Sequence, residues 1–287
     1  MIGSVSGVRL VIAGLAISAV LMVVMIALPP SVDDGKSETE TDTTSSSTTT
    51  SSSTTTVAPY DGWVDPASSG DAWGGSVEGL LTFRGNPTRS YYGEGPVPDA
   101  PRVLWKFPDE PMCTYAPIGR VSTWCGTGWT GQPAVFERDS RTWVVFGAYD
   151  HDVHFLDADT GRSILEPFPT GDIVKGSVTV DPDGYPLLYT GSRDNYLRVL
   201  AFDGEEPREL WSLSAEAAGV RKWNNDWDGS PMVVDDHLFV GGENSVFHIV
   251  ELNRGYDDDG TVTVAPELVF AAPGWDDALI ATVGDNV

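Results

Sequence analysis

Gly131-Gln132-Pro133-Ala134-Val135 begins a segment that recurs at Gly176-Ser177-Val178-Thr179-Val180 and at Gly229-Ser230-Pro231-Met232-Val233. Each copy predicts a β-strand that follows a turn. A second apolar run that ends in glycine follows in each copy, at residues 144–147, 187–191 and 238–241. The pattern therefore predicts a strand, a turn and a second strand in each of three units.

Each unit continues in the same way after that glycine. An acidic or amide residue lies three positions further on, at Asp150, Asp194 and Asn244. A third apolar run follows at residues 153–156, 197–200 and 247–252, and a fourth at 164–168, 210–213 and 268–270. Four short strands with a period of about 45 residues are the signature of a β-propeller blade, which must stack on neighbours to bury both faces.

We therefore predict an all-β fold with about three complete four-stranded blades. A closed propeller ring typically has four to eight blades, so the chain is expected to be a truncated part of one. An open stack of this kind would expose a sheet edge and the apolar faces of its end blades.

An apolar run near the N-terminus predicts a membrane segment. Residues 10–28 contain Ser18 as their only polar side chain, and as a helix they would reach roughly 28 Å at 1.5 Å per residue, close to the hydrocarbon thickness of a bilayer. Arg9 precedes the run and two aspartates follow it, which keeps the N-terminus in the cytoplasm and exports the rest. We expect residues 1–30 to be a transmembrane anchor, with a cleaved signal peptide as the alternative.

A tether follows the apolar run. Residues 43–56 are an unbroken series of Ser and Thr, which cannot bury enough apolar surface to fold. We expect residues 31–58 to be a disordered linker, open to O-glycosylation, that holds residues 59–287 off the membrane. The predicted location is thus the cell membrane, crossed once, with the C-terminal domain extracytoplasmic.

The charge of the chain limits its partners. The formal net charge is -25 and the pI is near 4.2, which repels nucleic acid and anionic lipid. The expected partners are the membrane, through the N-terminal helix, and a protein or a carbohydrate.

The two cysteines predict a disulfide. Cys113 and Cys125 are the only cysteines of the chain, and in an exported domain such a pair forms a bond that contributes up to about 3 kcal/mol. A metal site would need further ligands at suitable spacing nearby, and the local sequence has none.

Two further stretches resemble the pyrroloquinoline-quinone-like (PQQ-like) β-propeller family. They are Phe83-Arg84-Gly85-Asn86-Pro87-Thr88-Arg89 and the pair Phe146-Gly147-Ala148-Tyr149-Asp150 with Leu156-Asp157-Ala158-Asp159-Thr160-Gly161. The resemblance covers roughly residues 80–287. It implies a propeller, and a family that includes cofactor-bearing alcohol and sugar dehydrogenases, an outer-membrane assembly lipoprotein and sensor or enzyme-linked ectodomains.

One rim of such a propeller would hold the candidate site. The loops that lead into the first strands and the turns between second and third strands share that rim. Indole faces suit sugar rings and oxygen ligands suit calcium, whereas the structural alternative makes the Trp residues wedges and the Asp residues turn acceptors. The candidate residues are Trp223, Asn225, Asp226, Trp227, Asp228, Asp194 and Asn244.

Other polar groups are assigned no site. Asp257 and Asp259 precede Gly260 in a turn between the third and fourth strands, which faces away from the rim and is expected to be solvated. His154 and His248 occupy matching places, with Arg198 between them in the middle copy, and are predicted on the polar face of third strands. No nucleophile with its base is evident, so no catalytic residue is assigned.

These sequence features are consistent with two alternative functions. The preferred one is a noncatalytic binding or scaffold ectodomain without a cofactor. The alternative is a quinoprotein-like oxidoreductase, in which rim Asp and Asn residues would hold calcium and PQQ.

Overall fold

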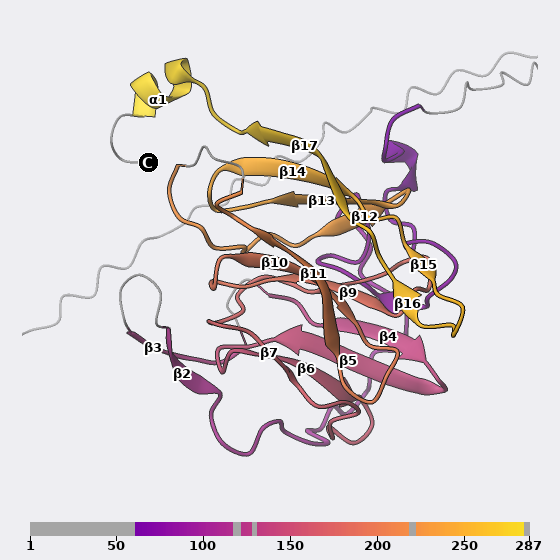
Figure 1. The fold of residues 1–287 in the computed structure, drawn as a ribbon. Helices are drawn as coiled ribbons and strands as arrows, with labels where there is room; N and C mark the ends of the chain where they lie inside the picture. Colours follow the sequence, from indigo (N-terminus) through magenta and orange to yellow (C-terminus); the bar gives the residue numbers. More distant parts are fainter. Residues whose placement is uncertain (1–60, 117–121, 128–130, 218–221, 284–287) are drawn as a thin grey trace, which may run out of the picture. The chain divides into compact units, whose positions relative to one another are not determined.

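Antiparallel strands make up nearly all of the regular structure (Figure 1). The computed structural model describes residues 61–116, 122–127, 131–217 and 222–283. The predicted anchor at residues 1–30 and the predicted linker at 31–58 lie outside these residues. Within them, the helices are the 3-10 turn η1 (Pro66–Ser68) and α1 (Asp277–Val283), and neither is long and apolar enough to cross a membrane.

Three sheets, each an antiparallel meander, follow the three predicted units. In the first unit β1 (Gly79–Leu80) joins the sheet beside its first strand. In the third unit the small hairpin of β15 (Gly255–Tyr256) and β16 (Val262–Thr263) precedes the last strand, β17 (Glu267–Pro273). The first sheet comprises β4 (Ala134–Arg138), β5 (Arg141–Gly147), β6 (Asp152–Asp157) and β7 (Phe168–Pro169); the second β8 (Thr179–Val180), β9 (Leu187–Gly191), β10 (Tyr196–Ala201) and β11 (Arg208–Ser214); the third β12 (Met232–Val234), β13 (His237–Gly241), β14 (Val246–Glu251) and β17 (Glu267–Pro273).

The fourth strand of the first unit differs from its prediction at residues 164–168. The chain makes a single bridge there, between Ser163 and Leu156, and β7 starts only at Phe168. Pro167 precedes it and has no N–H to donate to a ladder, which shortens the strand.

The three sheets share one apolar core and lie stacked in chain order (Figure 1). Fully buried side chains from every sheet meet in it, among them Phe155, Tyr189 and Val250. Glycines at the ends of the second strands allow close approach: a Cβ on Gly147 would collide with Val174, and one on Gly191 with Trp227. In the first two units this glycine is therefore required, because a side chain of the next unit packs directly against it.

The segment that contains Phe83 to Arg89 ties the inner strands of the three sheets together. The backbone N–H of Arg84 donates to Gln132 Oε1 at 3.1 Å in the first unit. The hydroxyl of Thr82 lies 2.8 Å from that of Thr179 in the second. Arg89 Nη2 donates to the carbonyl of Ser230 at 2.9 Å in the third. These contacts explain why a charged, glycine-containing stretch precedes the units.

The outer faces of the two end sheets differ. Trp105, Phe107 and Met112 cover the first sheet, where the indole N–H of Trp105 donates to the carbonyl of Ala158 at 2.7 Å. On the third sheet, Trp63 contacts Phe239, whereas Phe247 is 42% and Phe270 47% exposed. The third sheet thus presents an open apolar face, as expected for the end of a stack.

Candidate functional site

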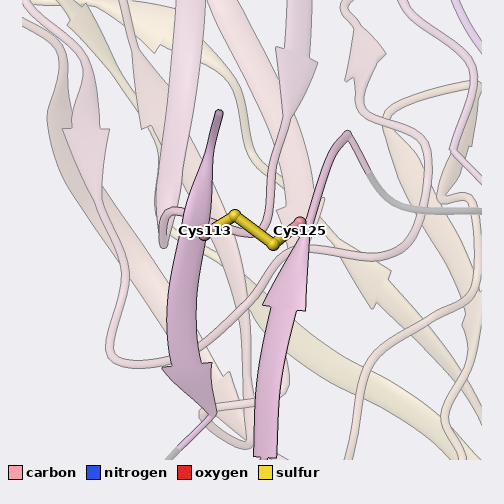
Figure 2. Close-up of a disulfide and its surroundings, with 2 residues drawn as sticks. All are labelled: Cys113 and Cys125. Carbon is pink, nitrogen blue, oxygen red and sulfur yellow. A yellow bond between two sulfur atoms is a disulfide. The ribbon is translucent and has the colours of Figure 1, made fainter. Parts of the chain in front are cut away.

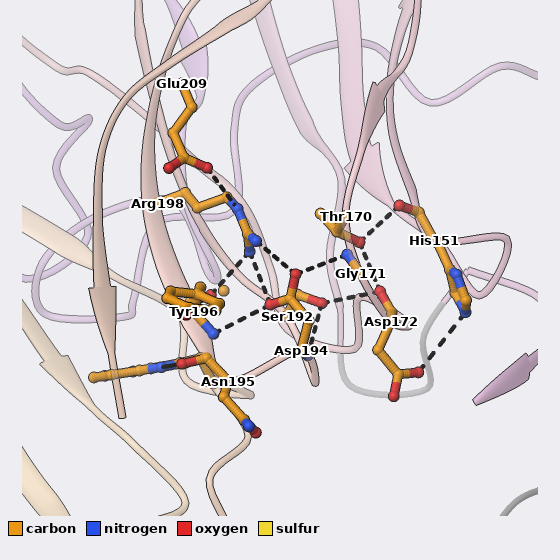
Figure 3. Close-up of polar contacts among 12 residues, drawn as sticks. His151, Thr170, Gly171, Asp172, Ser192, Asp194, Asn195, Tyr196, Arg198 and Glu209 are labelled. Atoms are coloured by element: carbon orange, nitrogen blue, oxygen red, sulfur yellow. Dashed lines mark hydrogen bonds and ion pairs between the residues drawn. The ribbon is translucent and has the colours of Figure 1, made fainter. Parts of the chain in front are cut away.

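The loop that leads into the second sheet meets the rim turn of the first unit and the rim turn of its own unit (Figure 3). Thr170 donates its hydroxyl to the carbonyl of His151 at 2.6 Å, and the N–H of Gly171 donates to Asp194 Oδ2 at 2.7 Å. Ser192 donates its hydroxyl to the carbonyl of Asp172 at 2.9 Å. Lead-in loops and second-to-third-strand turns therefore share one end of the sheets.

The same turn is built three times from one acceptor. Asp150, Asp194 and Asn244 each accept the N–H of the residue two positions on, at 3.2, 3.1 and 3.0 Å. An Asp or Asn side chain at this place stabilises a tight turn. The acidic or amide residue of each unit therefore has a structural role, because its side chain stabilises the turn between the second and third strands.

The residue four positions after each acceptor is buried, which corrects the prediction that it lies on a polar face. His154 Nε2 is 2.9 Å from Asp150 Oδ2, and Arg198 is paired with Asp194 at 2.6 Å. In the third unit Asn244 donates instead to the carbonyl of Ala215 at 2.8 Å. Both ring nitrogens of His248 are buried, and no described residue is a hydrogen-bond partner for them. The strand face that carries these residues is covered, by Phe107 at His154 and by Trp227 at His248, so a polar position here does not mark a solvent face.

An ion cluster joins the second and third units at this rim. Lys175 Nζ lies 2.8 Å from Asp226 Oδ2, 2.6 Å from Asp228 Oδ2 and 3.8 Å from Glu243 Oε1. Arg193 Nε is 3.5 Å from Asp226 Oδ2. Three carboxylates thus face two cations in a largely buried site, where an unpaired charge would be costly.

Burial raises the pKa values of the two aspartates in this cluster. Burial, and a hydrogen bond with Glu243, raise the pKa of Asp228 to about 7 against the opposing effect of Lys175. Burial also raises the pKa of Asp226. For Lys175, burial acts to lower the pKa, but the hydrogen bonds to the two aspartates outweigh it and the pKa is raised. Lys175 therefore stays charged, and Asp228 exchanges its proton near neutral pH.

Three acceptor oxygens of the same loop are left without partners. Asn225 Oδ1, Asp226 Oδ1 and Asp228 Oδ1 are buried and accept no hydrogen bond from the described residues. Asp226 is 1% exposed. Such oxygens are suited to a hard cation or an ordered water.

The two tryptophans of this loop do not act together. Trp227 is fully buried, donates its indole N–H to the carbonyl of Asn195 at 3.0 Å and packs against His248, with ring centroids 5.1 Å apart. Trp223 is 68% exposed. Trp227 is thus an inter-sheet wedge, and Trp223 alone offers a face to a sugar.

The turn at Asp257 lies at the other end of the sheets. Asp257 accepts the N–H groups of Asp259 and Thr261 at 3.0 and 2.8 Å. Its small hairpin, β15 (Gly255–Tyr256) with β16 (Val262–Thr263), is tied by the N–H of Val262 to Asp203 in the turn between β10 and β11. Antiparallel strands put that turn opposite the rim.

Sequence reasoning missed the cations of both inter-unit ion clusters. Lys175 contacts an acid 51 residues away. At the opposite end Arg254 pairs with Asp181 at 2.7 Å and with Asp236 at 2.6 Å. Partners so distant in sequence leave no local pattern, and only the strand register of stacked units could have located them.

Cys113 and Cys125 are joined by a disulfide in the hairpin of β2 (Cys113–Ala116) and β3 (Ser122–Cys125) (Figure 2). The two residues are directly opposite each other in the strand register. The N–H of Tyr149 donates to the carbonyl of Gly126 at 2.8 Å, so the hairpin is attached to the first unit at the rim.

Comparisons with known proteins show only a weak likeness. No protein-family model matches the chain, and no curated protein matches it. The solved structure of BamB from Moraxella catarrhalis is similar over 53% of this chain and 56% of its own, with 14% identity and a TM-score of 0.26. The chain thus spans about half the length of that structure, and we base the functional proposal on the geometry above.

Proposed function

We propose that this chain is part of a PQQ-like β-propeller that is anchored in the cell membrane, faces the extracytoplasmic side and acts as a noncatalytic scaffold for a protein partner. The observation that carries the proposal is the open apolar face of the third sheet. Phe239 opposes Ile249 and Gly241 opposes Phe247 across β13 and β14, so these four residues share one face. Phe270 on β17 opposes Ile249 and extends the face.

The two covered sheets indicate what kind of surface would fit the open face of the third sheet. Val174 covers Gly147 of the first sheet and Trp227 covers Gly191 of the second, but no atom of the described residues lies within 4 Å of a Cβ built on Gly241. The surface therefore suits another β-sheet that presents apolar side chains and places a bulky residue over Gly241. Apolar patches of this kind mark protein interaction sites. A net charge of -25 opposes pairing of two copies, so a different protein or a further unit of the same repeat is the favoured occupant.

The proposed location rests on the sequence and on the disulfide. The apolar run at residues 10–28 has the length of a membrane span, and disulfides such as Cys113–Cys125 persist in oxidising compartments. Protease added to intact cells should remove the domain and leave a short membrane fragment. Protection of the domain would contradict this topology, and release of a mature domain without protease would indicate signal cleavage.

Two observations at the rim favour the scaffold over the oxidoreductase alternative. A quinone needs a flat surface to stack on, but Trp227 is buried between sheets. Lys175 Nζ already lies among the three carboxylates. Titration of the purified full-length protein with PQQ and calcium, followed by absorbance, tests this alternative directly: a saturable spectrum of bound quinone would revive it.

The scaffold proposal is tested by a photocrosslinking residue at position 247 or 270 in cells that express the full chain. The expected result is one discrete adduct from each position, with the crosslinked peptide in an apolar strand of the partner. Tyr196 is the matched control because it is 41% exposed on β10 of the second sheet. Absence of adducts at both positions, or the same adducts from position 196, would overturn the proposal.

A further inference from the structure

The rim turn of the first unit carries three metal-binding side chains. Asp150, Asp152 and His154 alternate along the chain as it enters β6. Each offers one ligand atom, a carboxylate oxygen or a ring nitrogen, and these three atoms all lie within 4.8 Å of one another. The group mixes nitrogen and oxygen donors, unlike the all-carboxylate cluster around Lys175.

The repeat explains two of these residues but not the third. Asp150 and His154 occupy the positions that Asp194 and Arg198 fill in the second unit, where the same four-residue spacing forms an ion pair. The position of Asp152 is taken by Tyr196 in the second unit and by Val246 in the third. The extra carboxylate is therefore specific to the first unit.

Asp152 has no evident structural task. Its carboxylate makes no hydrogen bond or ion pair with the described residues, while its N–H is the donor of the turn. Burial and the nearby charge of Asp150 raise its pKa, and the nearby histidines only partly offset this. A half-buried carboxylate with a second carboxylate beside it is stabilised when a cation joins them.

The histidine is held in place for coordination. The ring of His154 packs against those of Phe107 and Phe146, with centroid distances of 5.1 and 5.3 Å. Its Nε2 is 2.9 Å from Asp150 Oδ2. Two ligands bound tetrahedrally to one ion at about 2.1 Å each would be separated by about 3.4 Å, so the pair needs to open by only about 0.5 Å to bind an ion in place of sharing a proton.

We propose that Asp150, Asp152 and His154 bind a divalent first-row transition-metal ion, for which zinc is the probe. One imidazole and two carboxylates match the ligand preferences of zinc and its neighbours better than those of calcium, which prefers oxygen ligands alone. Three protein ligands leave at least one coordination position for water or for a partner's side chain. The site is independent of the proposed scaffold function.

Calorimetric titration of the detergent-solubilised full chain with zinc chloride tests the proposal. The expected result is one tight site, together with a rise in melting temperature that scales with zinc concentration. Asp152→Asn should weaken zinc binding at least 10-fold and leave the melting temperature in a chelator unchanged, because the Asp152 carboxylate makes no hydrogen bond or ion pair with the described residues. Cobalt in place of zinc should give the visible absorption of a nitrogen-ligated ion.

Matched variants separate this site from others. Asp258→Asn alters an exposed acid of the opposite turn, and Asp228→Asn alters the cluster at Lys175; both should bind zinc as the wild type does. His154→Gln keeps a donor toward Asp150 and should abolish the cobalt absorption. If Asp152→Asn binds zinc with wild-type affinity, or if Asp228→Asn alone loses the tight site, the proposal is wrong.

Discussion

Trp227 of the third unit fills the space beside Gly191 of the second, so that a Cβ placed on Gly191 would come well within 3.0 Å of it. Gly241 holds the equivalent place in the third unit, and within the described part of the chain no neighbour lies within 4 Å of such an atom. Gly191→Ala should therefore destabilise the fold by about 1–3 kcal/mol through overpacking. Gly241→Ala should change stability by less than about 0.5 kcal/mol. Denaturant unfolding of the two variants compares them, and equal losses would show that the third sheet is covered at Gly241 after all.

The glycines also show how far sequence reasoning reaches. Glycine, alternating apolar runs and turn acceptors recur locally, so one antiparallel sheet in each of the three units was predictable and is confirmed, whereas the fifth strand β1 of the first sheet was not predicted. The burial of His154, Arg198 and His248 was not, because alternation along one strand does not reveal a sheet stacked on its polar side. The ion clusters of Lys175 and Arg254 depend on register between units, which no local pattern encodes.

Asp228 should make stability depend on pH. Its pKa is raised by burial to about 7, against an ordinary value of 3.8. A group whose pKa is raised on folding contributes stability that is fully present below the unfolded pKa and is lost as the pH rises through the folded one. The free energy of unfolding of the wild type should thus fall, relative to Asp228→Asn, between pH 4 and pH 7. Parallel pH profiles for the two proteins would contradict a shared proton at this cluster.

His248 should act in the opposite direction. Burial lowers its pKa from 6.5, so the folded state favours the neutral ring. Stability is then present above the unfolded pKa and is lost as the pH falls below 6.5. His248→Phe should weaken this acid dependence, whereas His237→Phe, at a position near a turn, should retain it. Urea unfolding at a series of pH values measures both, and the same acid slope in wild type and His248→Phe would exclude His248 as its cause.

The disulfide should stabilise its hairpin more than the sheets. Its loop is short, with a sequence separation of 12, for which the entropy of loop closure limits the gain to about 3 kcal/mol. Cys113→Ser with Cys125→Ser should release the hairpin to hydrogen exchange while the N–H groups of β9 and β10 keep their protection. Mass mapping without reductant should find one crosslinked peptide in the wild type, and free thiols at both positions in native material would contradict the bond.

The rim cluster should respond to calcium if its unpartnered oxygens form a cation site. Asp226 and Asp228 each bury one carboxylate oxygen that accepts no hydrogen bond from the residues that the structure describes, and a bound ion would raise the melting temperature in line with its binding free energy. The double change Asp226→Asn and Asp228→Asn keeps side-chain size and removes charge, so it should abolish a calcium-dependent shift. Asp257→Asn with Asp259→Asn alters the opposite turn and should leave that shift intact.

Each variant pair is compared with the wild type in chelator and in calcium, because loss of the contacts to Lys175 lowers the calcium-free melting temperature of the rim pair only. A wild type without any shift would leave Lys175 and the proton of Asp228 as the sole counter-charges of these carboxylates, and a shift lost only in the Asp257 pair would move the cation site to the other end of the sheets.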